Sequence, residues 1–143
     1  MTNDPQVAAN KAAWRLALEQ LSAGDVDGFV QVFAPGYVRH CQAMSPQLQK
    51  IHGPAAMRDW LLGNRTAFPD YREDLEDIVG EGNMLAWRSV GTGTQQGAFG
   101  PFPASGRRLS IVIIGMHRFE NGKIAETWTS WDGATAARQL GLV

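Results

Sequence analysis

The sequence contains a single cysteine, Cys41, among its 143 residues, so no disulfide can form within the chain. Nothing therefore requires an oxidising compartment, and an isolated cysteine is typical of a small buried side chain. The longest apolar run, around residues 111–114, is far too short to cross a bilayer, and the first residues lack the charged and apolar regions of a signal peptide. We expect a cytoplasmic protein with no membrane partner.

An excess of either charge is also lacking. Thirteen Lys and Arg residues balance fourteen Asp and Glu residues, for a net charge of −1, and this argues against a nucleic-acid partner, which would favour a clustered basic surface. The chain has no internal repeat, low-complexity tract or linker. Its length and its 44% hydrophobic content suit one globular domain, residues 1–143, with a core of its own.

Helical spacing of apolar residues dominates the first half of the chain. Asp4-Pro5 is a typical helix start, because the aspartate can cap the helix and the fixed φ of proline suits the first turn. The same spacing recurs after Asp25 and again after Gly53-Pro54. The predicted elements are helices at 5–22, 25–34 and 53–68, a short strand at 37–40 and a polar loop from 41 to 50.

The second half favours strands. Residues 109–132 predict a β-hairpin, because two apolar, β-branched runs flank Asn121-Gly122, a strong signal for a tight turn. Two further extended segments, 71–79 and 84–94, come before it. The acidic residues in the first of these are expected to form a solvated strand face. A loop at 97–106, rich in Gly, Pro and Phe, separates the segments from the hairpin.

Helices followed by four long strands indicate an α+β fold. We expect the N-terminal helices to pack on a curved antiparallel or mixed sheet as a conical barrel. A sheet that bends more than the helices can fill leaves an internal pocket.

One face of the predicted hairpin is a candidate pocket floor. Placing the turn near Gly122 pairs His117 with Thr127 and Gly115 with Thr129, and strand alternation adds Trp131 to the same face. This face is more polar than a plain core needs. His117 could carry a proton or donate a hydrogen bond to a substrate carbonyl. The alternative is a core histidine satisfied by Thr127.

Further candidates come from elsewhere in the chain. Asp132 follows two tryptophans, so desolvation could raise its pKa and prepare it for acid–base work; alternatively it caps a terminal helix at 134–140. His40 could point into the same cavity, and Trp87 could shape its wall. The histidines lack the spacing of metal ligands, so no metal site is predicted.

Short motifs spread along nearly the whole chain resemble the SnoaL-like polyketide cyclase (ester cyclase) family, within the nuclear-transport-factor-like superfamily. They are Phe68-Pro69-Asp70, Asp77-Ile78-Val79, Glu81-Gly82-Asn83, Gly93-Thr94, Gly106-Arg107, the run from Arg118 to Glu126, Trp128 with Asp132, and Gln139-Leu140-Gly141. The resemblance implies a conical barrel with a deep pocket, assembled as a homodimer or homotetramer. It also implies intramolecular aldol condensation on a hydrophobic or polycyclic small molecule, without cofactor or metal.

The sequence departs from this family at the residues that carry the chemistry. Aligned on the shared motifs, the acid–base aspartate of the antibiotic cyclases falls on Thr129 and their pocket histidine falls on Gly115. A histidine frequent in the family falls on Gln95. Threonine cannot remove a carbon-bound proton at neutral pH, so the aldol mechanism does not transfer unchanged.

Three functions follow as alternatives. In the first, a small-molecule enzyme uses His117 or Asp132 to move the proton, while His40 or Gln95 holds an oxygen. The residues expected to shape or line its pocket are Trp87, Phe99, Thr127, Thr129 and Trp131. In the second, the protein binds a small molecule without catalysis. The third is an epoxide hydrolase or isomerase, with Arg39 or Arg88 beside Asp132.

Overall fold

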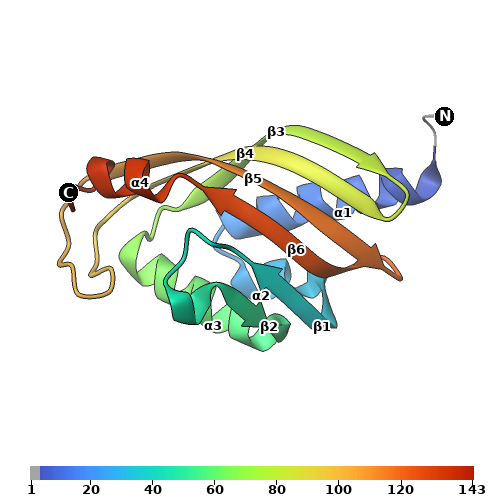
Figure 1. Cartoon of the computed structure of the whole chain (residues 1–143), viewed down its shortest axis with the longest axis horizontal. Coiled ribbons are helices and arrows are strands. Elements are labelled where there is room, and N and C mark those ends of the chain that lie inside the picture. Colours follow the sequence, from blue (N-terminus) through green and yellow to red (C-terminus); the bar gives the residue numbers. More distant parts are fainter. Residues whose placement is uncertain (1–3) are drawn as a thin grey trace.

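The computed structural model describes residues 4–143 (Figure 1). The helical elements are α1 (Pro5–Ser22), α2 (Val26–Phe29), the 3-10 turns η1 (Val30–Val32) and η2 (Pro46–Leu48), α3 (Gly53–Ala67) and α4 (Gly133–Gln139). The strands are β1 (Phe33–His40), β2 (Lys50–His52), β3 (Arg72–Glu81), β4 (Met84–Thr94), β5 (Arg108–Glu120) and β6 (Lys123–Trp131).

The six strands form one curved mixed sheet in the order β2-β1-β6-β5-β4-β3. Only the β1–β6 pair is parallel. Helix α1 packs against β3 at one edge of the sheet and α3 packs against β1 near the other, so the two helices cover its inner face (Figure 1). The predicted α+β architecture, with N-terminal helices on a curved sheet, is confirmed.

The hairpin has the predicted register between residues 113 and 118 of its first strand. His117 lies opposite Thr127 and Gly115 opposite Thr129. Asn121 and Gly122 both have positive φ, 50° and 77°, which a two-residue turn of this hand requires. The register shifts by one residue near the turn, beyond Arg118, where a bulge interrupts the ladder.

The segment after α2 differs from the prediction. Strand β1 begins at Phe33 rather than at residue 37 and runs through Pro35-Gly36, where its pairing with β6 is irregular. An irregular stretch tolerates the missing N–H of proline. Part of the expected loop before residue 50 is the η2 turn, and Lys50–His52 forms strand β2, which is too short to show an alternating pattern.

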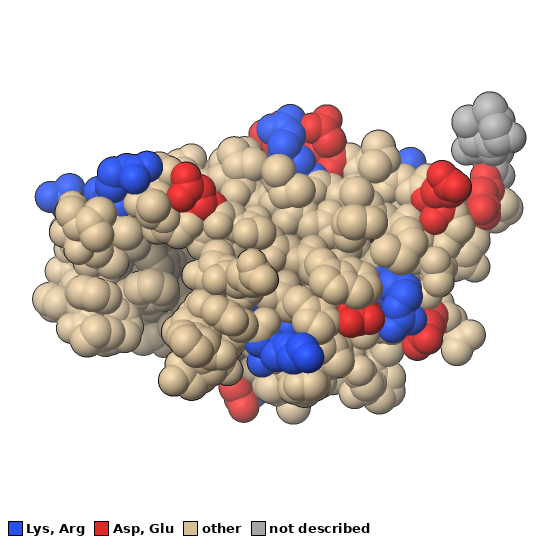
Figure 2. All heavy atoms as spheres, in the orientation of Figure 1, with Lys and Arg blue, Asp and Glu red and all other residues tan. Residues whose placement is uncertain are grey.

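Two apolar clusters hold the fold together. The larger joins Trp14, Leu18 and Leu21 of α1 to the inner face of the sheet, and the smaller joins Phe68 and Leu140 to β5. Cys41 is buried and unbridged, as predicted for an isolated cysteine. No helix among residues 4–143 is long and apolar enough to cross a membrane. The face in Figure 2 carries charges of both signs, with several basic side chains side by side at its left end.

Candidate functional site

A cavity of about 280 Å³ lies between the inner face of the sheet and the helices. Its walls are largely apolar, with four tryptophans and further aromatic and aliphatic side chains. The tryptophans are Trp14 of α1, Trp60 of α3, Trp87 of β4 and Trp131 of β6. Figure 2 shows a recess on this side of the molecule, and the cavity lining includes Phe99 and part of α4 at the same end. An apolar pocket with few polar groups is the usual form of a small-molecule site.

His117 lines this cavity and is 1% exposed. Its ring stacks on Trp87 at a centroid distance of 4.0 Å and meets Trp14 edge-on at 4.2 Å. Burial holds the pKa of His117 well below its ordinary value of 6.5, so the imidazole is neutral at physiological pH. Its Nε2 atom is buried and has no hydrogen-bond partner among residues 4–143.

A buried hydroxyl joins His117 to β1. The Tyr37 hydroxyl donates to Thr127 Oγ1 at 2.8 Å, and the same oxygen lies 2.8 Å from His117 Nδ1. Burial raises the pKa of Tyr37, which therefore stays protonated. The predicted pairing of His117 with Thr127 is present, and the Thr127 hydroxyl oxygen contacts both Tyr37 and His117. The third residue, Tyr37, was absent from the predicted site.

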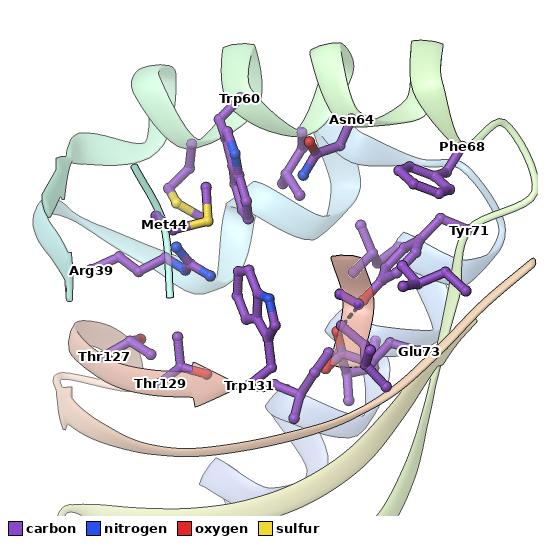
Figure 3. A pocket seen from close by; sticks show the side chains of 18 of the residues that line it. Arg39, Met44, Trp60, Asn64, Phe68, Tyr71, Glu73, Thr127, Thr129 and Trp131 are labelled. Atoms are coloured by element: carbon purple, nitrogen blue, oxygen red, sulfur yellow. Dashed lines mark hydrogen bonds between the residues drawn. The ribbon is translucent and has the colours of Figure 1, made fainter. Parts of the chain in front are cut away.

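Glu73 lines the pocket, which the sequence pattern did not predict. It was expected on a solvated strand face, but its carboxylate lines the cavity and accepts hydrogen bonds from the Tyr71 hydroxyl at 2.9 Å and from Ser89 Oγ at 2.8 Å (Figure 3). Burial raises the pKa of Glu73 above 4.5 although both hydroxyls favour the charged form. Strand alternation sends Arg72 and Asp74 to the opposite side.

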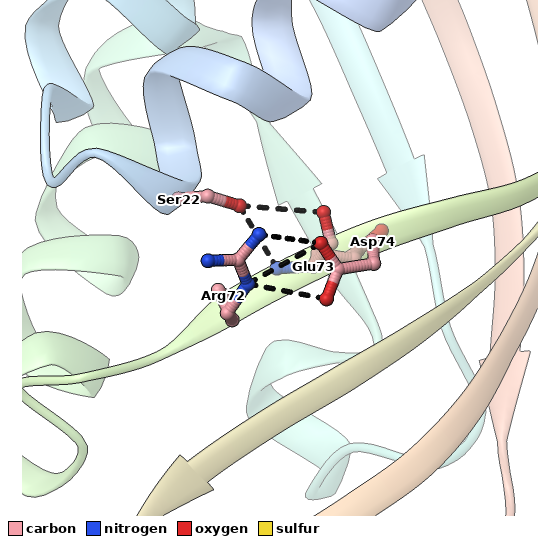
Figure 4. A network of polar contacts seen from close by, with 4 residues as sticks. All are labelled: Ser22, Arg72, Glu73 and Asp74. Carbon is pink, nitrogen blue, oxygen red and sulfur yellow. Dashed lines mark hydrogen bonds and ion pairs between the residues drawn. The ribbon is translucent and has the colours of Figure 1, made fainter.

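The backbone around Glu73 is fixed to α1. Ser22 Oγ accepts from the Glu73 amide at 3.0 Å and lies 3.3 Å from the Glu73 carbonyl oxygen, to which it donates (Figure 4). The neighbouring Arg72 and Asp74 pair with each other at the surface (Figure 4). These contacts hold the start of β3 against the helix, so the Glu73 side chain has a defined direction into the cavity.

Arg39 enters the cavity from β1. Its guanidinium carbon lies 4.4 Å from the centre of the Trp60 ring and 5.7 Å from that of Trp131 (Figure 3). The residue is only 7% exposed. The parallel pairing with β6 places Arg39 beside Thr127, so Tyr37 and Arg39 face inward.

Asp132 does not line the cavity. It caps α4, accepting from the Thr135 amide at 3.1 Å and from the Thr135 hydroxyl at 2.7 Å, and these bonds lower its pKa. The expectation of a desolvated aspartate with a raised pKa is wrong, because the chain turns outward after Trp131; the capping alternative is correct. Arg88 pairs with Asp77 at the surface, so it does not approach Asp132 either.

His40 and Gln95 also lie outside the cavity lining. His40 faces the outer side of the sheet, stacks on Trp128 and pairs with Glu126 at 2.6 Å, because its neighbour Arg39 takes the inward position. Gln95 is fully buried but fastens the 97–106 loop, donating to the Pro103 carbonyl at 3.1 Å and accepting from Ser105 Oγ at 2.6 Å. The expectation that either residue holds a substrate oxygen is not supported by these positions.

The other predicted lining residues are in place. The structure puts Trp87, Phe99, Thr127, Thr129 and Trp131 in the cavity wall. Thr129 donates to the Ile114 carbonyl at 3.1 Å. No three His, Cys, Asp or Glu side chains within 4–143 are grouped as metal ligands would be.

Three solved structures of similar shape are 25–27% identical in sequence to this chain. AclR from Streptomyces galilaeus, described as a hydroxylase, is 25% identical, with a TM-score of 0.81 over 96% of this chain and 98% of its own. IdmH from Streptomyces antibioticus, described as a polyketide cyclase, is 26% identical, with a TM-score of 0.77 over 92% of this chain and 98% of its own.

TsrD from Streptomyces laurentii is 27% identical, with a TM-score of 0.81 over 95% of this chain and 97% of its own. No curated protein is significantly similar to this chain in sequence. The profile of the SnoaL-like polyketide cyclases matches residues 11–140. The chain therefore belongs to the SnoaL-like polyketide cyclase family.

Proposed function

We propose that this protein is a cofactor-independent enzyme that moves a proton on a carbonyl-containing, hydrophobic or polycyclic small molecule, as in aldol-type cyclisation. The observation that supports this most directly is the Glu73 carboxylate inside an aromatic cavity, hydrogen-bonded to Tyr71 and Ser89. Family membership and the relatives described as cyclases agree with this chemistry.

Glu73 suits the role of general base. A carboxylate in an apolar site is a stronger base than one in water, and its raised pKa brings it closer to the operating pH. It would accept a proton from the carbon next to the substrate carbonyl, and the resulting enolate would attack a second carbonyl of the same molecule. The proton then passes to the new alkoxide oxygen, so no external oxidant or reductant is needed.

His117 remains a second candidate for the proton carrier. His117 lines the same cavity, and its Nε2 atom has no hydrogen-bond partner among the described residues. That atom is, however, enclosed by neighbouring side chains, and burial lowers the pKa of the imidazole. A proton transfer at Nε2 would need a neighbouring side chain to move aside, because this atom is buried. Glu73 therefore takes precedence over His117 in the proposed mechanism.

A panel of polyketide-like β-dicarbonyl substrates tests the proposal, with proton exchange or ring closure followed by NMR. Glu73→Gln keeps the shape and both hydroxyl neighbours, and removal of a general base is expected to reduce the rate about 10²–10⁴-fold. Asp74→Asn is the matched control, because Asp74 lies beside Glu73 and pairs with Arg72 at the surface. Full activity of Glu73→Gln would eliminate the carboxylate as the base.

Separate His117→Gln and Asp132→Asn variants test the two proton carriers that the sequence predicts. Because Asp132 is exposed and asparagine also caps helices well, we expect Asp132→Asn to keep near wild-type activity. A rate loss in His117→Gln that exceeds the loss in Glu73→Gln would assign the proton transfer to His117.

A ligand-binding protein without catalysis is the second candidate. Two features favour this function. Thr129 and Gly115 stand where the antibiotic cyclases that this sequence resembles carry their catalytic aspartate and histidine. The Trp87 ring also fills the space over Gly115. Mass spectrometry of co-purified ligand separates the two functions. An unaltered, tightly held compound with no turnover in the substrate panel favours binding.

We also propose that the protein assembles as a homodimer or homotetramer through the outer face of β5 and β6. Four apolar side chains are 41–59% exposed there: Val112, Ile114 and Met116, which alternate along β5, and Trp128 of β6, which lies opposite Met116. A contiguous patch of this kind marks an association surface, and a second copy can bury the same patch by two-fold symmetry. Ile114→Lys is expected to yield monomers in analytical ultracentrifugation, whereas Leu16→Lys, elsewhere on the surface, leaves the assembly intact.

A further inference from the structure

The guanidinium of Arg39 is buried without a polar partner. Among residues 4–143 its side chain makes no hydrogen bond and no ion pair, and Nη1 is fully enclosed. Trp60 and Trp131 contribute the electrostatic attraction of their ring faces. Aromatic ring faces do not replace hydrogen-bond acceptors for the five N–H groups of a guanidinium. The N–H donors of Arg39 are therefore not used in hydrogen bonds.

Burial of an unpaired charge is unfavourable, and structural arginines in protein interiors are normally bound to a carboxylate or to several carbonyl groups. Glu73 is a candidate for such a partner, because it lines the same cavity and the positive charge of Arg39 acts to lower the pKa of its carboxyl against the effect of burial. Glu73 is, however, held by Tyr71 and Ser89 and forms no ion pair with Arg39. The position of Arg39 is therefore not explained by a structural salt bridge.

We propose that Arg39 is an anion anchor, which binds a carboxylate group of the small molecule that enters the cavity. A carboxylate matches the planar, forked arrangement of guanidinium donors and would pair with the N–H groups on the side of Arg39 that lines the cavity. The indoles of Trp60 and Trp131 form an apolar wall on which a flat ring system can lie. The ligand class is accordingly an aromatic or polycyclic carboxylate.

The arrangement also gives the ligand a direction. Figure 3 shows Arg39 on one side of the Trp131 indole and the hydrogen-bonded Tyr71–Glu73 pair on the other. An anionic group would be attracted to Arg39 and repelled by Glu73, so the uncharged part of the ligand faces Glu73. The inference depends on the cavity being the ligand site, as proposed above, and is independent of whether the bound ligand reacts.

Two probes of nearly equal shape test the anchor. 2-Naphthoate carries a carboxylate, whereas 2-acetonaphthone has a neutral acetyl group in its place. Calorimetry or tryptophan fluorescence measures both dissociation constants for the wild type and for Arg39→Met, which keeps an unbranched side chain and removes the charge. Arg88→Met is the control for net charge, because Arg88 pairs with Asp77 at the surface. Circular dichroism and the melting temperature establish that each variant is folded.

We expect the wild type to bind 2-naphthoate at least tenfold more tightly than 2-acetonaphthone. Arg39→Met should lose this preference while still binding the ketone, Arg88→Met should retain it, and Arg39→Lys should retain part of it if Arg39→Met does not fold. An unchanged preference in Arg39→Met, or equal binding of both probes by the wild type, overturns the anchor. Failure of 2-naphthoate to bind the wild type also overturns it. Loss of turnover in Glu73→Gln is a separate result, so the anchor and the proposed catalysis can fail independently.

Discussion

The Trp87 indole occupies the space that a side chain at Gly115 would need. A Cβ atom on Gly115 would lie 2.8 Å from Trp87 Cζ2 and 2.8 Å from the Trp128 carbonyl oxygen, and closer still to Trp87 Cη2. The two residues face each other across the β4–β5 pair. The indole also stacks on His117. In this chain the position of the missing histidine is therefore filled by a large ring that forms part of the cavity wall.

Gly115→Ala should destabilise the protein by about 1–3 kcal/mol, because one added methyl group must displace the indole or the backbone of β6. Gly115→His should have a larger effect. Combined with Trp87→Leu, which opens the space, the histidine should be tolerated better, with a coupling energy of about 1–3 kcal/mol in the double-mutant cycle. Urea unfolding of the wild type, Gly115→Ala, Gly115→His, Trp87→Leu and the double variant measures these effects. Strictly additive effects would show that the two positions do not compete for space.

Thr127→Val should cost about 2–5 kcal/mol of unfolding free energy. The substitution keeps the shape but removes the oxygen that serves both the Tyr37 hydroxyl and His117 Nδ1, and each buried polar group left unpaired costs about 1–3 kcal/mol. Thr129→Val, two residues along the same strand, removes only a bond to a carbonyl oxygen and should cost less than about 1 kcal/mol. Equal losses in the two variants would contradict the bridging role of Thr127.

Stability should fall as the pH drops below 6.5, because His117 is held neutral in the folded state. Its folded pKa lies below the unfolded value, so the unfolded chain binds the additional proton, and the loss approaches about 1.4 kcal/mol per pH unit. Urea unfolding between pH 7.5 and 5.0 measures the slope. The dependence of the unfolding free energy on pH should be weaker in His117→Phe, which lacks the buried imidazole. It should be unchanged in His52→Gln, because His52 is exposed. A parallel slope in His117→Phe would assign the acid sensitivity to other groups.

Tyr71→Phe and Ser89→Ala should each raise the pKa of Glu73 further. Both hydroxyls donate to the carboxylate and so favour its charged form, against the effect of burial. ¹³C NMR of labelled glutamate follows the titration directly, and the acidic limb of kcat/KM should move to higher pH with it. A downward shift would mean that the hydroxyls stabilise the protonated acid instead.

The hairpin shows how much local pattern can determine. Asn121-Gly122 between two β-branched runs predicted both the turn and the pairing of His117 with Thr127, and the structure has both. Turn residues and the alternation of inward and outward side chains act over only a few positions. The residues next to the turn therefore suffice to predict the hairpin and its pairing. The bulge beyond Arg118 was not predicted, because an extra residue in one strand leaves the apolar pattern nearly unchanged.

The candidate site was only partly predictable. Strand β3 alternates charged and mixed residues, so no apolar face in its sequence indicated that Glu73 points inward while Arg72 and Asp74 point outward. In β1 the choice between Arg39 and His40 depends on pairing with a strand more than eighty residues away in the sequence. Asp132 lies beside tryptophans in the sequence, yet its carboxylate caps a helix in solvent.

The sequence by itself determined the family, the order of the longer helices and strands and the pairing of His117 with Thr127, because these follow from local propensity, turn chemistry and short motifs. The tertiary structure alone decided which charged side chains enter the cavity. The inward position of Glu73 depends on the contacts of β3 with Ser22 of α1, and that of Arg39 depends on the parallel pairing of β1 with β6. Such long-range pairings fix which side of a strand is enclosed, and the polar residues on these strands carry no local mark of it.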